Sequence, residues 1–174
     1  GATAADHDPE AMEPDRPRQP STLERPHVVI VSDDPDLQSF LGEGLVYAGL
    51  WTSGIASAIQ TLEVFRLRTF DLALIDAALG GFGPLELIRR LRRAPRAAEA
   101  EREAIDIPIV VIAAGPAEID AAAAVAAGAN EVIFAPIDLD VLAARLFAVS
   151  RSWRAVHPDR PWADEAAQRR SDSP

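Results

Sequence analysis

Apolar residues in the middle of the chain follow two alternating patterns. Short continuous apolar runs, typical of strands buried on both faces of a parallel sheet, alternate with segments whose apolar residues recur at every third or fourth position, typical of helices. The runs predict strands at 27–33, 50–55, 71–76, 107–113 and 130–136. The segments that follow each run predict helices at 35–49, 57–68, 84–93, 116–128 and 138–153.

Local start and stop signals support these boundaries. Pro35 stands in the first turn of the first predicted helix and Gly49 at its end, as the fixed φ of proline and the permissive backbone of glycine favour. Asp138 precedes the last helix as an expected N-cap, because its side chain can accept free backbone N–H groups there. The alternation of strands and helices predicts a (βα)5 α/β fold, in which helices cover both faces of a parallel sheet.

Ligands of such sheets bind beyond the carboxyl ends of the strands, so the residues at these ends are the candidates for chemistry. The first strand ends in Ser32, Asp33 and Asp34, and the third ends in Asp76. The fourth and fifth strands end in alanines and a proline, which offer no polar side chain. The converging carboxylates allow two interpretations: a Mg²⁺ site with oxygen ligands, or a pair of solvated loop acids.

Composition divides the 174 residues into one domain with two polar ends. Residues 1–26 are rich in proline and acids and poor in large apolar residues, so we expect a disordered tail. We assign 27–153 to one domain and 154–174 to a polar C-terminal tail or linker, although Trp162 could dock back onto the fold. The connection 94–106 is charged, and we expect it to be partly helical.

Charge and residue usage argue against several classes of function. A net charge of −10 opposes nucleic-acid binding, which needs clustered cations. The chain has no cysteine and three scattered histidines, so we expect neither a thiolate site nor a histidine metal cluster. No apolar run approaches the ~18 residues that span a bilayer, and no segment has the pattern of a signal peptide. We therefore expect a soluble, cytoplasmic protein without a nucleic-acid or membrane partner.

Four segments in order resemble the receiver domain of bacterial two-component response regulators, and the resemblance covers residues 27–152. The segments are VSDDPDL (31–37), DLALIDAALGGFGPLEL (71–87), IPIVVIAA (107–114) and GANEVIFAPIDLDVL (128–142). The resemblance implies a flavodoxin-like, doubly wound parallel sheet with strand order 2-1-3-4-5. It also implies a signalling domain and not an enzyme.

The resemblance gives roles to individual residues. Asp76 stands at the phospho-acceptor position, and Asp33 stands at the acidic position that binds Mg²⁺ directly. The backbone carbonyl of Ala78 would be the third protein ligand of that ion. Pro136 matches a structural proline after the last strand, which in the family often follows a cis peptide bond, a rare bond elsewhere.

Four positions depart from the family pattern. Ser32 replaces the first acid of an acidic pair, and Ala113 replaces the hydroxyl residue that bonds the phosphoryl oxygen. Val132 replaces the aromatic residue that moves with that hydroxyl, and Ala135 replaces the lysine that pairs with the phosphoryl group. All 17 basic residues of the chain are arginine, and GC-rich codon usage would explain arginine in place of lysine but not alanine. We therefore interpret these positions as degenerate and expect only weak Mg²⁺ binding.

These observations lead to three hypotheses. The first is a pseudo-receiver that acts by protein–protein interaction in a two-component or phosphorelay pathway without being phosphorylated. Its partner would be a histidine kinase, a phosphotransferase or a linked output domain, and a homodimer stays open. The second is a phosphorylation-competent receiver that accepts phosphate at Asp76. The third is a metal-dependent phosphohydrolase, which is disfavoured because the hydrolases of this topology place a second aspartate where Ala78 stands.

Overall fold

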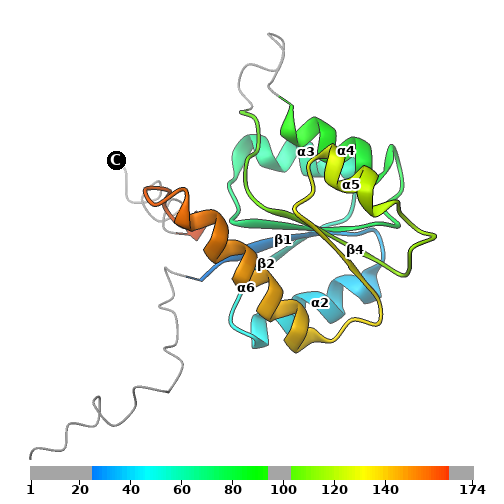
Figure 1. The fold of residues 1–174 in the computed structure, drawn as a ribbon, viewed down its shortest axis with the longest axis horizontal. Helices are drawn as coiled ribbons and strands as arrows, with labels where there is room; N and C mark the ends of the chain where they lie inside the picture. The colour runs from blue at the N-terminus through cyan, green and yellow to red at the C-terminus, as the bar shows by residue number, and fades with distance from the viewer. Residues whose placement is uncertain (1–24, 94–102, 165–174) are drawn as a thin grey trace, which may run out of the picture.

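The computed structural model describes residues 25–93 and 103–164, so most of the predicted tail 1–26 and of the connection 94–106 lies outside the described residues. At its centre is a five-stranded parallel sheet with the order β2-β1-β3-β4-β5 (Figure 1). The strands are β1 (His27–Val31), β2 (Trp51–Ile55), β3 (Leu72–Asp76), β4 (Ile109–Ala113) and β5 (Glu131–Phe134). The predicted sheet and its strand order are confirmed.

Helices cover both faces of this sheet. They are α2 (Pro35–Tyr47), α3 (Ala58–Leu67), α4 (Gly83–Arg92), α5 (Ala121–Ala127) and α6 (Leu139–Ala155). Figure 1 shows α3, α4 and α5 on one face and α2 and α6 on the other. Among the described residues, no helix combines the length and the apolar character that crossing a membrane requires.

Alternate residues of each central strand pack into two separate hydrophobic clusters. Val29 and Val31 belong to the cluster under α3, α4 and α5, whereas Val28 and Ile30 belong to the cluster under α2 and α6. Every residue of β1, β3 and β4 is buried, which explains why these strands read as continuous apolar runs. Burial on both faces fixes the register of the strands, and the carboxyl ends of β1 and β3 therefore lie side by side.

The helix predicted at 116–128 begins later than its sequence pattern suggested. Asp120 caps it, because its Oδ1 atom accepts the N–H of Ala122 at 3.0 Å. The preceding residues form a turn in which the N–H of Glu118 donates to the carbonyl of Gly115 at 3.0 Å. An aspartate N-cap stabilises a helix start because it accepts hydrogen bonds from free backbone N–H groups. A proline in the first turn is compatible with a helix but accepts no such bonds. Helix α5 therefore begins after Asp120.

Side-chain caps and one glycine position α2 and α6. Asp34 caps α2 and Asp138 caps α6, the latter as predicted, and each accepts two backbone N–H groups. The chain enters α6 after a cis peptide bond that precedes Pro136, as the resemblance implied. Gly44 allows the two helices to approach closely, because a Cβ there would lie 2.5 Å from Leu139 Cδ1. The carboxylate of Asp34 is thus bonded to the N-terminus of α2.

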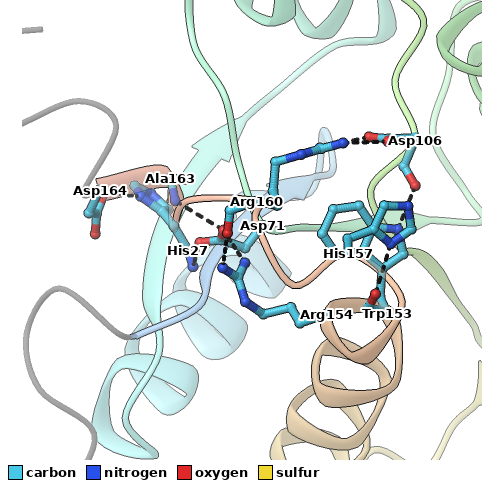
Figure 2. A network of polar contacts seen from close by, with 9 residues as sticks. All are labelled: His27, Asp71, Asp106, Trp153, Arg154, His157, Arg160, Ala163 and Asp164. Atoms are coloured by element: carbon cyan, nitrogen blue, oxygen red, sulfur yellow. Dashed lines mark hydrogen bonds and ion pairs between the residues drawn. The ribbon is translucent and has the colours of Figure 1, made fainter. Parts of the chain in front are cut away.

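The chain packs on the domain beyond the boundary that we placed at residue 153. Helix α6 ends at Ala155, and residues 156–164 return to the amino-terminal edge of the sheet (Figure 2). We name residues 156–164 the C-terminal clasp. The N–H of Ala163 donates to Asp71 Oδ1, just before β3, at 3.0 Å. Residues 156–164 therefore pack on the domain, and the boundary at residue 153 stays a prediction.

The clasp also contacts β1 and α6. His27 Nδ1 lies 2.8 Å from Asp164 Oδ1, and its Nε2 lies 2.8 Å from Ser53 Oγ in β2. Trp162 docks back onto the fold, with the guanidinium of Arg154 lying 3.6 Å from the centroid of its indole ring. These contacts join the end of the described chain to the first residue of the sheet.

Candidate functional site

The carboxyl ends of β1 and β3 bring Ser32 and Asp76 into direct contact. Val31 and Ile75 are paired in the parallel register, so the residues that follow them lie side by side. Ser32 Oγ donates a hydrogen bond to Asp76 Oδ2 at 2.7 Å, and the N–H of Ala78 donates to Asp76 Oδ1 at 2.9 Å. Asp76 is only 6% exposed and Ser32 only 1%. The acceptor carboxylate is thus buried against two neutral donors.

Asp33 lies at the same edge and is held by the same loop. Its Oδ2 atom accepts the N–H of Gly80 at 3.0 Å, which ties the end of β1 to the loop between β3 and α4. A Cβ at Gly80 would lie 3.1 Å from that carboxylate oxygen, so the contact depends on the close approach of the backbone. Asp33 itself is exposed. The structure thus brings both predicted carboxylates, Asp33 and Asp76, to one loop.

The predicted Mg²⁺ ligands are a weak fit to a metal site. Within residues 25–93 and 103–164, no group of three or more acidic, histidine or cysteine side chains is placed to hold a metal ion. Each oxygen of Asp76 already accepts a hydrogen bond, and Asp33 accepts one. Mg²⁺ can be bound through one or two carboxylates when it keeps several waters. Asp33, Asp76 and the carbonyl of Ala78 therefore stay a predicted ligand set.

Aliphatic side chains stand where the resemblance implies phosphate-binding and switching groups. Ala113 ends β4, one residue beyond Ile112, which is paired with Asp76 in the sheet register. Ala135 follows β5, and its N–H donates to the carbonyl of Ala113 at 2.8 Å. Val132 lies in β5 and packs against the cluster under α3, α4 and α5. These positions supply neither a hydroxyl, nor an amino group, nor an aromatic ring.

Cations are placed away from this edge of the sheet. The ion pairs between described residues lie on the surfaces of α3 and α4, between β5 and α6, and at the amino-terminal edge. None of the arginines or histidines in the described ranges pairs with Asp33 or Asp76. The sequence has no lysine, and no arginine in the described residues supplies a cation to Asp33 or Asp76 in its place.

Sequence reasoning missed one acidic residue at this edge. The N–H of Ala114, the residue after β4, donates to Glu118 Oε1 at 3.0 Å. The hydrophobic pattern had placed Glu118 inside a helix, where its side chain would point along the helix surface. The signal that could have revealed the contact is Asp120, a strong N-cap that leaves Glu118 in the preceding turn.

The parallel sheet with the order β2-β1-β3-β4-β5 and helices on both faces defines a class, the flavodoxin-like α/β domains. The family model described as "Response regulator receiver domain" matches residues 28–147. The chain belongs to the response regulator receiver family of two-component systems.

Curated relatives are transcriptional regulators of greater length. Transcriptional regulatory protein CseB of Streptomyces avermitilis is 30% identical over 146 residues, which cover 83% of this chain and 58% of that protein. Transcriptional regulatory protein AfsQ1 of Streptomyces coelicolor is 28% identical over 126 residues, covering 72% of this chain and 52% of that protein. The chain thus spans between half and three-fifths of the length of these relatives.

Solved structures share the fold over nearly their whole length. A sensor protein from Polaromonas sp. JS666 is 27% identical with a TM-score of 0.59, and covers 74% of this chain and 98% of its own. A protein from Chloroflexus aurantiacus J-10-fl, named a putative response regulator, has 24% identity and a TM-score of 0.63, and covers 73% of this chain and 98% of its own. The second likeness supports the fold alone.

Proposed function

We propose that this protein is a pseudo-receiver, which acts by protein–protein interaction in a two-component or phosphorelay pathway and does not require phosphorylation. The observation that carries this proposal is the set of partners around Asp76. The carboxylate is buried and accepts hydrogen bonds only from the hydroxyl of Ser32 and the N–H of Ala78 among the described residues. The positions that would hold a phosphoryl group, Ala113 and Ala135, carry methyl groups.

The charge balance of the site supports the proposal. A phosphoryl group brings roughly 1.5 to 2 negative charges to an edge that already holds Asp33 and Asp76. Each charge-assisted hydrogen bond that such a group could have made contributes roughly 1.5–3 kcal/mol, which corresponds to about tenfold or more in equilibrium. Without the donors at 113 and 135, the modified state lacks that stabilisation.

The chain also lacks the side chains that would convert phosphorylation of Asp76 into a conformational change. A ligand shifts a conformational equilibrium only through contacts that differ between the two states. In this family such contacts are implied at the hydroxyl and aromatic positions, where this chain has Ala113 and Val132. A phosphoryl group on Asp76 would therefore make few contacts that could shift the conformation of the domain. We favour a mode of action in which a partner binds the preformed fold.

Two exposed surfaces suit such a partner. Phe40 and Tyr47 of α2 are exposed, the latter to 95%. Val125 of α5 and Val141 of α6 are also exposed, and these helices flank β5 in the sequence. The resemblance implies these two surfaces as partner sites, so a histidine kinase, a phosphotransferase or an output domain is the proposed class of partner, and the same surfaces leave a homodimer open.

The test is beryllofluoride with Mg²⁺, a phosphoryl analogue, added to the ¹⁵N-labelled protein and followed by amide NMR spectra. We expect no global shift in the wild-type protein, and we expect binding to appear in A113T/A135K, which restores a hydroxyl and an ammonium group. The control is the D76N variant of A113T/A135K, which should not respond. Stoichiometric binding with a global shift in the wild-type protein would instead support a phosphorylation-competent receiver.

A further inference from the structure

The backbone of β4 presents one N–H group toward the acceptor strand. The N–H of Ala77 donates to the carbonyl of Ile112 at 2.8 Å, so the polar groups of Ile112 face β3. The N–H of Ala135 donates to the carbonyl of Ala113 at 2.8 Å, so those of Ala113 face the β5 side. Because the backbone of a strand alternates with a period of two, the N–H of Ala114 faces the β3 side again. It lies where β3 ends in Asp76.

Two backbone donors, at the ends of β3 and β4, are taken by carboxylates of the chain itself. The N–H of Ala78 donates to Asp76, and the N–H of Ala114 donates to Glu118 Oε1 at 3.0 Å. With methyl groups at Ala113 and Ala135, an added oxyanion would depend on these two N–H groups together with the hydroxyl of Ser32 and the N–H of Gly80, which are also taken by carboxylates. An oxyanion would have to displace Glu118 to use the N–H of Ala114.

Glu118 is held in place by its turn and by its neighbours. Its own N–H donates to the carbonyl of Gly115 at 3.0 Å. Ile119, the next residue, is buried in the cluster under α3, α4 and α5, and Asp120 caps α5. The carboxylate is therefore presented to the Ala114 N–H by a fixed stretch of backbone.

We propose that Glu118 is an internal competing carboxylate, which occupies the N–H donor at the end of β4 and weakens the binding of phosphoryl groups and other tetrahedral oxyanions beside Asp76. This inference rests on the proposed function, and it adds a specific residue that lowers the affinity of the site for such ligands. Glu118 competes in two ways. Its oxygen occupies the N–H donor, and its negative charge opposes a second anion near Asp33 and Asp76.

The experiment is a titration with inorganic phosphate in the A113T/A135K background, followed by the amide signals of the ¹⁵N-labelled protein. We expect E118A to bind phosphate about tenfold more tightly than its parent, since one charge-assisted hydrogen bond no longer competes. The amide of Ala114 should move with phosphate in E118A. E118Q keeps an acceptor oxygen but loses the charge, and we expect a smaller gain. Glu43→Ala removes an exposed acid of α2 and controls for the change in net charge.

Several outcomes would overturn the inference. They are equal phosphate affinity of E118A and its parent, a gain in E118A that Glu43→Ala reproduces, or an Ala114 amide that does not respond to phosphate in E118A. Failure to detect phosphate binding in any of the variants would overturn it as well. The proposed function fails by a different measurement, stoichiometric beryllofluoride binding to the wild-type protein, so the two can be told apart.

Discussion

One aspartate is buried at the amino-terminal ends of the strands and one at their carboxyl ends, and the two carboxylates have different partners. Asp71, before β3, and Asp76, at its end, are both 6% exposed. Asp71 accepts the N–H groups of His27 and Ala163 at 2.8 and 3.0 Å and lies 3.6 Å from Arg154 Nη1 (Figure 2). Asp76 accepts hydrogen bonds from the hydroxyl of Ser32 and from one backbone N–H group. The same residue type at the same depth is thus paired with a cation at one edge and with neutral donors at the other.

The difference separates a carboxylate that links several elements of the fold from one that has only local hydrogen-bond donors. A buried carboxylate is expensive unless it is paired and hydrogen-bonded. At the amino-terminal edge Asp71 joins β1, α6 and the clasp, and its charge is opposed by Arg154. Even so, burial raises the pKa of Asp71 above its ordinary value and outweighs the lowering effects of the two N–H groups and Arg154. At the other edge, Asp76 joins only two neighbouring loops.

The largest expected effect comes from replacing each aspartate by asparagine. In D71N one of the two buried N–H groups meets an amide NH₂, and Arg154 loses one of its partners, so we expect the free energy of unfolding to fall by about 2 kcal/mol. In D76N the amide can accept from the Ala78 N–H and donate to Ser32, and a buried charge disappears, so we expect no loss and at most a gain of about 1 kcal/mol. Urea unfolding at neutral pH measures both, and equal losses would end the comparison.

A smaller effect is expected in the pH dependence of stability. The folded-state pKa of Asp71 is raised, so between its ordinary value of 3.8 and the raised value the folded protein binds more protons than the unfolded chain. Stability then falls as pH rises through this window, because its slope with pH follows the protons bound by the unfolded chain minus those bound by the folded one. The stability difference between wild type and D71N should therefore shrink as pH rises from below 3.8 through the raised pKa of Asp71. A difference that grows over this range would contradict the raised pKa.

The smallest effect is expected at an exposed pair of the same edge. Arg160 makes two hydrogen bonds to Asp106, at 3.0 and 2.7 Å, and the pair raises the pKa of Arg160 and lowers that of Asp106. Both side chains are exposed, so Arg160→Ala should lower the free energy of unfolding by less than about 1 kcal/mol. Arg154→Ala, which leaves the buried Asp71 without its cation, should be more costly. Thermal unfolding of the two variants compares them, and equal losses would mean that burial of the partner does not matter here.

The sequence predicted the fold well because the fold depends on patterns that are local. Continuous apolar runs identified β1, β3 and β4, and the cap at Asp138 identified the start of α6. The convergence of the carboxyl ends of β1 and β3 was also predicted, since parallel strands in register bring these ends together, but the hydrogen bond from Ser32 to Asp76 was not. The start of α5 was wrong because the predicted range 116–128 took no account of Asp120, which caps the helix.

The clasp was beyond the sequence because it depends on long-range geometry. Asp71 and Ala163 are 92 positions apart, and their hydrogen bond exists only because α6 ends beside the start of β3. Trp162 indicated that the segment could dock, but not where. The contact of Glu118 with Ala114 spans only four positions, and it was missed because the helix start was placed before Glu118.

The position of the clasp has a mechanical consequence. The clasp is hydrogen-bonded to His27, the first residue of β1, and to Asp71, the residue before β3. Each of these strands is five residues long, so its far end, with Ser32 or Asp76, lies roughly 17 Å away. A force transmitted through the clasp would therefore act first on the amino-terminal ends of β1 and β3, the two strands whose carboxyl ends carry Ser32 and Asp76.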